Sequence, residues 1–372
     1  MRVLIAPDKF RGTLTAVEAA RAIATGWRRG RPNDRLEEVP LADGGEGTMD
    51  TLVSALGGER RTTRVRGPLG DGHEAAFALV PSGGATLGVV ESARASGLAL
   101  VSEGRRDALR ASTWGTGDLI LSAVRAGVSE VLVCLGGSAT TDAGAGMAQA
   151  LGVRLLDEAG APIPPGGAGL LQLARIDASG LDPAAGRVSV QAACDVDAPL
   201  TGPSGAAHVF APQKGASVDE VILLDRALAH FAAVVHRDLG LDVRTVPGAG
   251  AAGGLGAGLT VFLGARLRPG VELVMDAVGL WGQLEASDLV ITGEGAYDAS
   301  TLGGKVPAGV LTAARAVGVR TLVLCGRSEL PSGEVEVRSL TERFGEERAL
   351  GDPRRALEDL AAEVAEGVSS PG

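Results

Sequence analysis

Three glycine-rich loops carry the side chains best suited to chemistry, because each combines glycines with carboxylate or hydroxyl groups. They span residues 42–47 (ADGGEG), 136–144 (GGSATTDAG) and 292–298 (TGEGAYD). Backbone N–H groups in such loops can bind an anion such as phosphate, particularly where a helix begins. Aspartate and glutamate would repel a bare phosphate, so their presence favours a divalent cation such as Mg²⁺ between them. Together the three loops predict a phosphate and magnesium site.

Four carboxylates in these loops are candidate ligands, and each also has a purely structural interpretation. Asp43 and Glu46 are three residues apart across two glycines, so they could bind a metal ion. Asp43 could instead cap the helix that follows it. Glu294 and Asp298 allow the same two interpretations.

Hydroxyl groups and a second acidic pair extend the set of candidates. Ser138, Thr140 and Thr141 could bond phosphate oxygens, or they could cap the next helix. Asp195 and Asp197 follow a predicted strand, where a carboxylate could accept a proton from a substrate hydroxyl. An Asx turn at the strand end is the structural alternative, and spacing alone favours that turn.

Lysine is scarce in this chain. Of the 35 Lys and Arg residues only Lys9, Lys214 and Lys305 are lysine, and all three lie in loop segments that contain Gly or Pro. A lysine retained where arginine is otherwise used could supply a compact point charge with three donors. Chance retention in surface loops is the alternative, and Lys305 is the strongest of the three candidates for a function.

The two ends of the chain predict one domain that positions these loops. Residues 3–6 form an apolar run typical of a buried strand. Thr15 and Glu18 form a T-x-x-E capping box that predicts a helix to about Arg28. Strand, loop and helix recur over residues 36–56 and again from residue 288, through strands at 289–292 and 321–324 to a terminal helix at 352–367. Repeated βα units predict a parallel sheet with helices on both faces.

The middle of the chain has a different texture and predicts an inserted domain. Short β segments are expected over residues 60–91, helices near 116–126 and 218–239, strands at 131–135 and 188–193, and irregular chain over 158–186. We therefore predict a discontinuous, doubly wound α/β domain (1–60 and 288–372) with a mixed α/β domain (61–287) inserted. The G-x-G-x-x-G run at Gly248, Gly250 and Gly253 favours close helix packing or a backbone-lined pocket over dinucleotide binding.

Composition excludes several classes of protein. Hydrophobic residues make up 45% of the 372 residues and charged residues 22%, which predicts a folded chain. The net charge of −10 argues against a general nucleic-acid binder, and no apolar stretch approaches the length of a membrane span. Neither a P-loop nor the protein-kinase signatures are present. Three widely spaced cysteines, no zinc pattern and no signal peptide predict a reducing, cytoplasmic location.

Taken in order, eight segments resemble the type 1 glycerate kinase family. They are residues 5–12 (IAPDKFRG), 42–48 (ADGGEGT), 136–142 (GGSATTD), 193–200 (ACDVDAPL), 210–216 (FAPQKGA), 250–257 (GAAGGLGA), 288–295 (DLVITGEG) and 301–307 (TLGGKVP). The resemblance runs from residue 3 to about residue 326. It implies ATP-dependent phosphorylation of D-glycerate with Mg²⁺, to 2-phosphoglycerate or 3-phosphoglycerate, in a cleft between two α/β domains.

The resemblance also suggests roles for individual residues. Asp195 would be the base for the glycerate hydroxyl, and Lys305, Lys9 and Arg11 would balance phosphate or carboxylate charge. Substrate contacts are expected from Asp8, Asp43, Glu46, Glu294 and Asp298, of which Asp43 and Glu294 are also the candidate magnesium ligands. Nucleotide phosphates are expected at Gly136, Gly137, Ser138, Thr140, Thr141 and Asp142.

Two alternative functions remain open at this stage. A kinase of another small hydroxy acid would use the same residue types, and a substrate panel would separate it from a glycerate kinase. A non-catalytic nucleotide or metabolite sensor would bind ATP without releasing ADP, although acidic groups in every loop count against it. We expect a small-molecule substrate, no nucleic-acid or membrane partner, and leave a homodimer open.

Overall fold

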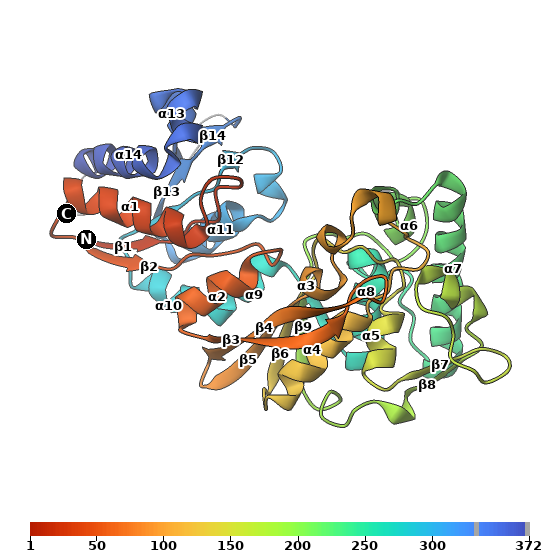
Figure 1. The fold of residues 1–372 in the computed structure, drawn as a ribbon. Helices are drawn as coiled ribbons and strands as arrows, with labels where there is room; N and C mark the ends of the chain where they lie inside the picture. The colour runs from red at the N-terminus through yellow and green to blue at the C-terminus, as the bar shows by residue number, and fades with distance from the viewer. Residues whose placement is uncertain (331–334, 369–372) are drawn as a thin grey trace. The chain divides into compact units, whose positions relative to one another are not determined.

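The structure is a computed structural model of the chain, and it describes residues 1–330 and 335–368 (Figure 1). Contacts divide the chain into two compact units. The first contains Met1–Asp43, Asp50–Leu56 and Val271–Gly372, and the second contains Gly44–Met49 and Gly57–Gly270. Residues 271–287, which the sequence analysis placed in the inserted domain, thus fall in the first unit, because helix α10 (Leu280–Glu285) packs on helix α11 (Val306–Val317).

The first unit is built on a five-stranded parallel sheet. Its strand order is β15 (Glu336–Ser339), β13 (Arg320–Cys325), β11 (Leu289–Thr292), β1 (Arg2–Ile5) and β2 (Arg35–Glu38). All four neighbouring pairs are parallel, with Leu4 opposite Val290 at the centre. The doubly wound parallel sheet predicted from the βα rhythm is confirmed.

Two long helices lie side by side over this sheet, α1 (Ala16–Gly30) and α14 (Pro353–Gly367) (Figure 1). The predicted capping box opens α1, since the Thr15 side chain accepts from the Glu18 N–H and the Glu18 carboxylate accepts from Thr15. Gly26 allows the close approach of α14, because a Cβ there would lie 2.0 Å from the Glu358 carbonyl oxygen. The small residue is therefore required by packing.

The second unit has a six-stranded mixed sheet in the order β10 (Arg266–Arg268), β9 (Ser189–Ala193), β6 (Glu130–Cys134), β5 (Ala85–Glu91), β4 (Gly72–Ser82) and β3 (Glu59–Arg66). Strands β3, β4 and β5 are antiparallel neighbours, whereas β5, β6, β9 and β10 run parallel. The mixed α/β character predicted for the inserted domain is confirmed.

Helices of the second unit enclose its main hydrophobic core. They include α4 (Trp114–Arg125), α5 (Ala145–Ala150), α7 (Val218–Leu239) and α8 (Ala251–Leu263). The predicted bounds of α7 are confirmed, because Ser217 and Glu220 form a capping box and Gly240 ends the helix in a left-handed conformation. Helix α2 (Thr48–Leu56) joins the two units along the chain.

Several short elements were not expected from the sequence. They are α3 (Ala93–Ser96), α6 (Ala206–Phe210), α9 (Gly270–Ala277), α12 (Leu340–Phe344), α13 (Glu346–Gly351) and the pairs β7 (Arg154–Leu156) with β8 (Arg175–Asp177) and β12 (Ala296–Tyr297) with β14 (Arg327–Ser328). Within the stretch predicted to be irregular, the 3₁₀ segments η3 (Gly167–Gln172) and η4 (Ala178–Gly180) alternate with turns. No helix in the described residues is long and apolar enough to cross a membrane.

Candidate functional site

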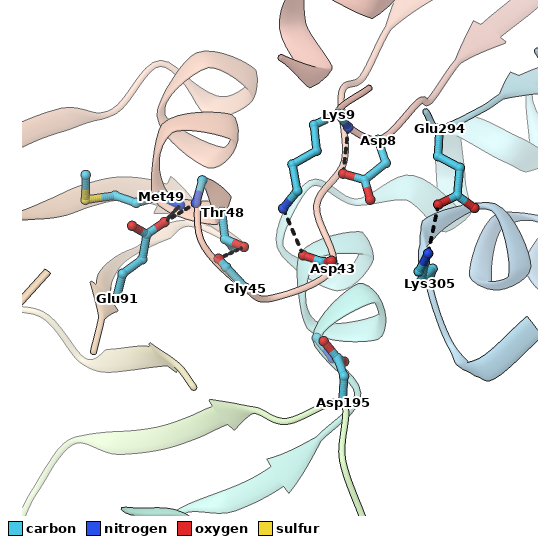
Figure 2. Close-up of polar contacts among 12 residues, drawn as sticks. Asp8, Lys9, Asp43, Gly45, Thr48, Met49, Glu91, Asp195, Glu294 and Lys305 are labelled. Carbon is cyan, nitrogen blue, oxygen red and sulfur yellow. Dashed lines mark hydrogen bonds and ion pairs between the residues drawn. The ribbon is translucent and has the colours of Figure 1, made fainter. Parts of the chain in front are cut away.

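Three carboxylates of the first unit follow the carboxyl ends of parallel strands. Asp8 comes after β1, Asp43 after β2, and Glu294 after β11. These strands are neighbours in the sheet, in the order β11, β1, β2. The carboxyl edge of a parallel sheet is where ligands bind in open α/β folds. The structure therefore gathers at one edge three side chains that are widely separated in sequence (Figure 2).

Asp8 has the most perturbed environment of the three. It is 4% exposed, and its Oδ1 accepts the Lys9 backbone N–H at 2.7 Å. Burial raises the pKa of Asp8 to about 7, and the negative charges of Asp43 and Glu294 add to the rise, while Lys9 opposes it. A carboxylate that exchanges its proton near neutral pH is suited to acid–base work.

Lys9 and Asp43 form an ion pair beside Asp8. The Lys9 Nζ lies 3.4 Å from the Asp43 Oδ1, and the two side chains are 33% and 27% exposed. Asp43 does not cap a helix, because α2 begins only at Thr48. Partly exposed groups of opposite charge can exchange their contact with each other for contacts with an ionic ligand.

A second ion pair joins Glu294 to Lys305. The Glu294 carboxylate is 5% exposed; its Oε1 accepts from the Thr301 hydroxyl at 2.5 Å and its Oε2 from the Lys305 Nζ at 3.3 Å. Burial raises the pKa of Glu294, and the bonds from Thr301 and Lys305 oppose that rise. Lys305 is also the residue before α11, so its ammonium lies where a helix N-terminus already favours anions (Figure 2).

Arg11 and Asp298 have less specific surroundings. Arg11 is exposed, and its backbone passes close to Gly295. The Asp298 Oδ1 accepts from the Ser300 N–H at 2.8 Å and from the Ser300 hydroxyl, and these bonds lower the pKa of Asp298. The geometry of Asp298 matches the turn-forming alternative, and its contact with substrate stays a prediction.

The carboxylate oxygens of the first unit are suitable ligands for a hard cation, but they do not form a complete set of protein ligands around it. No group of three or more His, Cys, Asp or Glu within residues 1–330 and 335–368 is placed to hold a metal ion. Mg²⁺ is commonly held by one or two carboxylates together with substrate phosphates and water. The donor set of Asp43 and Glu294 fits that mode.

The second unit gathers polar groups in the same way. Glu91 ends β5, the loop at residues 135–138 follows β6, Asp195 follows β9, and Gly270 follows β10. These four strands are parallel neighbours, so the groups share one sheet edge. The segment at residues 44–47 lies against this edge, because a Cβ on Gly44 would be 2.5 Å from the Gly270 Cα, and one on Gly136 would be 3.5 Å from the Gly45 Cα.

Asp195 is exposed at this edge. Its Oδ1 accepts the Gly270 backbone N–H at 2.9 Å, which ties the ends of β9 and β10 together. Glu46 is likewise exposed, within the segment at residues 44–49. Both carboxylates are accessible to a ligand, and their predicted roles stay predictions.

Glu91 was missed by the sequence analysis. Its carboxylate is 1% exposed. Oε1 accepts the Met49 N–H group at 2.9 Å (Figure 2) and the Gly47 N–H group at 3.0 Å. Oε2 accepts from the Arg94 Nε at 2.6 Å. Thr48 adds a bond from its hydroxyl to the Gly45 carbonyl at 2.7 Å. Glu91 therefore holds the segment at residues 44–49 from a neighbouring strand; the strand-end position of a carboxylate was the only signal in the sequence.

The loop at residues 136–142 divides into an accessible half and a buried half. Gly136 and Gly137 are accessible and Ser138 is 7% exposed, whereas Thr140, Thr141 and Asp142 are fully buried. The buried residues can shape the loop but cannot reach a ligand in this conformation. The hydroxyls do not cap the next helix, since α5 begins at Ala145 with Gly144 before it and no side-chain cap.

Asp142 organises the buried half. Its carboxylate accepts from the Thr113 N–H and hydroxyl and from the N–H groups of Gly144 and Gly146, at 2.8 to 3.2 Å. Burial raises the pKa of Asp142, and these four bonds oppose the rise. Asp142 thus has a structural role within the loop, and its predicted contact with a nucleotide stays a prediction.

The glycine-rich run near residue 250 packs against the same loop. A Cβ on Gly253 would lie 1.9 Å from the Thr140 carbonyl oxygen, and one on Gly258 would lie 2.5 Å from the Ala143 carbonyl oxygen. Ala252, Gly253 and Gly254 all have positive φ, so α8 is kinked at its start. Close helix packing, one of the two favoured interpretations of this run, is what the structure shows.

Acidic and ammonium groups at the carboxyl ends of parallel strands are typical of the ligand sites of α/β enzymes. A profile of the glycerate kinase family matches residues 3–369. A glycerate kinase of Halalkalibacterium halodurans is 51% identical over 324 residues, 87% of this chain and 85% of the relative. The glycerate 2-kinase of Escherichia coli is 41% identical over 383 residues, covering 100% of both chains.

A solved structure agrees with these matches. A crystal structure assigned to a glycerate kinase 2 from Salmonella typhimurium LT2 superposes with a TM-score of 0.90 and 43% identity, covering 99% of this chain and 98% of the other. The chain belongs to the glycerate kinase family, whose members are phosphotransferases with an alcohol group as acceptor.

Proposed function

We propose that the protein is an ATP-dependent glycerate kinase that converts D-glycerate to 2-phosphoglycerate with Mg²⁺. Family membership supports the reaction class. The choice of the 2-hydroxyl is supported by the Escherichia coli relative, a glycerate 2-kinase that aligns over the full length of both chains. Phosphoryl transfer depends on positioning and on charge neutralisation rather than on a covalent intermediate.

The observation that carries this proposal is the pair of ion pairs at one sheet edge of the first unit. Lys9 with Asp43 and Lys305 with Glu294 supply two partly exposed ammonium groups and two carboxylates. The ammonium groups would balance the charge of a carboxylate or phosphate. Asp43 and Glu294 would hold Mg²⁺, which neutralises phosphate charge when it is bound.

The acceptor hydroxyl must lose its proton as the new P–O bond forms. We assign this proton to Asp195, an exposed carboxylate whose orientation is set by the Gly270 N–H. Asp8 is a second candidate that the structure adds, because its pKa of about 7 suits proton transfer at neutral pH. Nucleotide phosphates would contact the backbone at Gly136 and Gly137, with the buried residues of that loop acting as its support.

Phosphorus NMR of the purified protein with Mg-ATP and D-glycerate tests the proposal. We expect ADP together with a new phosphomonoester resonance that is split by a single proton, as for a phosphate on the 2-carbon. Splitting by a methylene pair would instead identify 3-phosphoglycerate. L-glycerate and other small hydroxy acids serve as controls, and ATP left unchanged with D-glycerate would contradict the proposal.

The proposal includes a reducing, cytoplasmic location. Cys134, Cys194 and Cys325 are all buried, and none of the three forms a disulfide. Burial raises the pKa of the Cys325 thiol to about 12. Buried cysteines that form no disulfide match a reducing compartment.

A further inference from the structure

The third lysine, Lys214, is buried beneath the loop at residues 136–142. It closes the 3₁₀ segment η5 (Pro212–Lys214), where its N–H bonds to the Ala211 carbonyl at 3.0 Å and Gly215 follows in a left-handed conformation. The side chain is only 2% exposed. Burying an ammonium group in such surroundings is unfavourable unless nearby groups compensate for its lost hydration.

The Lys214 ammonium compensates by donating to the Thr140 carbonyl oxygen. The same carbonyl is covered from another direction by Gly253, where any Cβ would clash with it at 1.9 Å. The peptide between Thr140 and Thr141 is therefore fixed by an ammonium group and by a helix that requires glycine at the contact. Two parts of the chain, residues 212–214 and 251–254, converge on one carbonyl group.

Charge adds to this hydrogen bond. Burial lowers the pKa of Lys214 to about 7, and the negative charge of Asp142 opposes that fall. Asp142 in turn is fully buried and accepts its four hydrogen bonds within the unit. Lys214 thus lies close enough to the loop's one buried carboxylate to offset its charge.

The remaining polar side chains of the loop also restrict its conformation. The Ser138 hydroxyl lies 3.0 Å from the Thr140 hydroxyl and 3.2 Å from the Ala252 carbonyl. Among the described residues the Thr141 hydroxyl, although buried, has no hydrogen-bond partner. This loop buries an ammonium group, a carboxylate and an unpaired hydroxyl. Replacing buried ionic groups by apolar groups of similar volume often leaves the free energy of unfolding unchanged or raises it, so stability alone does not explain this arrangement.

We propose that Lys214 is a positioning residue for nucleotide binding, which holds the loop so that Gly136 and Gly137 present their backbone to the phosphates. The proposal rests on the proposed function. It explains why this position is one of only three lysines in an arginine-rich chain. A compact ammonium group can reach the buried Thr140 carbonyl, whereas a planar guanidinium group needs more room.

Lys214→Met tests the proposal, because methionine keeps similar volume without a charge or a donor. We expect kcat/KM for Mg-ATP to fall at least tenfold, KM for D-glycerate to stay within twofold, and the increase in Tm caused by Mg-ATP to shrink. Arg106→Met is the matched control, since the Arg106 Nη1 donates at 3.3 Å to the neighbouring Gln213 carbonyl on the exposed side of the same segment. This control should change neither ATP parameter by more than twofold.

Lys214→Gln separates the hydrogen bond from the charge, because glutamine is neutral but retains an N–H donor. We expect Lys214→Gln to recover part of the ATP affinity lost in Lys214→Met. ATP parameters within twofold of wild type in Lys214→Met would overturn the proposal. Loss of the fold in both variants would also overturn it, because Lys214 would then serve stability. A wild-type protein that binds Mg-ATP but does not phosphorylate D-glycerate would refute the substrate and leave the Lys214 test intact.

Discussion

The carboxyl group of Asp8 titrates in a pH range where an exposed aspartate would be fully ionised. Its pKa is raised from 3.8 to about 7, first by burial and then by Asp43 and Glu294. The folded state therefore binds this proton more tightly than the unfolded state. The contribution of Asp8 to stability is present at low pH and is lost as pH rises from about 4 to about 7.

Asp8→Asn should accordingly affect stability and activity in opposite directions. Asparagine removes a buried charge, so its Tm should exceed that of wild type at pH 8, and the difference should shrink toward pH 4. In wild type, kcat/KM for D-glycerate should rise with pH up to about 7, and this limb should be absent in Asp8→Asn. Both proteins are measured with the same excess of Mg-ATP, so that ionisation of the nucleotide cancels. If kcat/KM of the variant still rose with pH in the same way, a group other than Asp8 would be responsible for that rise.

The proposed role of Asp195 as the base can be tested by substitution, with the neighbouring carboxylate Asp197 as the control. Asp195→Asn keeps the oxygen that accepts the Gly270 N–H but cannot take a proton, so kcat should fall by about 10²–10⁴-fold with the fold retained. Asp197→Asn removes an exposed charge two residues away and should stay within threefold of wild type. Steady-state kinetics and circular dichroism check both variants, and near-normal kcat in Asp195→Asn would remove it from the role of base.

The positions of candidate residues, as distinct from their roles, followed from the sequence where those residues come directly after a strand. Asp43 and Glu294 were identified by glycine-rich loops at predicted strand ends, and both are at the sheet edge. The raised pKa of Asp8 could not be predicted, because it depends on burial and on charges brought from two other strands. The burial of Asp142 could not be predicted either, because a loop sequence does not show which of its residues face inward.

At the scale of elements, Glu91 shows how one strand can control the start of a helix. Its Oε1 accepts two N–H groups at the start of α2, donors that a helix cannot satisfy internally. The bonds come from β5, so the helix start is capped by a residue distant in the chain. The ADGGEG segment owes part of its shape to this contact.

Removing the Glu91 carboxylate should therefore loosen the segment at residues 44–49. Glu91→Ala removes the carboxylate that accepts both N–H groups, which should lower the free energy of unfolding by about 2–4 kcal/mol. Glu91→Gln keeps an acceptor oxygen and loses only the partly exposed pair with Arg94, so its loss should be less than half as large. Urea unfolding measures both, and amide exchange at Gly47 and Met49 should accelerate in Glu91→Ala. Equal losses in the two variants would mean that the ion pair, not the cap, matters.

Elements with strong local signals were predicted well and short ones were not. The helices α1 and α7 carry capping boxes at their starts, so their N-termini followed from sequence. The helices α9 and α10 are short, and residues 271–287 were consequently assigned to the inserted domain. Their place depends on packing against α11, which no local pattern encodes.

At the scale of the whole molecule, the three cysteines should behave as one reporter of unfolding. Each is buried, and burial raises the pKa of Cys194 and Cys325, so that little thiolate forms in the folded state. A colorimetric thiol reagent at pH 8 should react with well under one equivalent in the folded protein and with all three cysteines in guanidinium chloride. Rapid reaction of one thiol without denaturant would show local opening around that residue.

The scarcity of lysine also bears on how the protein can be attached to other molecules. Lys214 is enclosed, whereas Lys9 and Lys305 are about one-third exposed, and the terminal amine is paired with Asp34. Dyes, biotin esters and activated resins that couple to primary amines would therefore meet mainly the two ammonium groups of the proposed active site. Routine amine labelling would therefore inactivate this protein by modifying its proposed active site. Coupling through carboxylates or through a terminal tag is the suitable route for immobilisation.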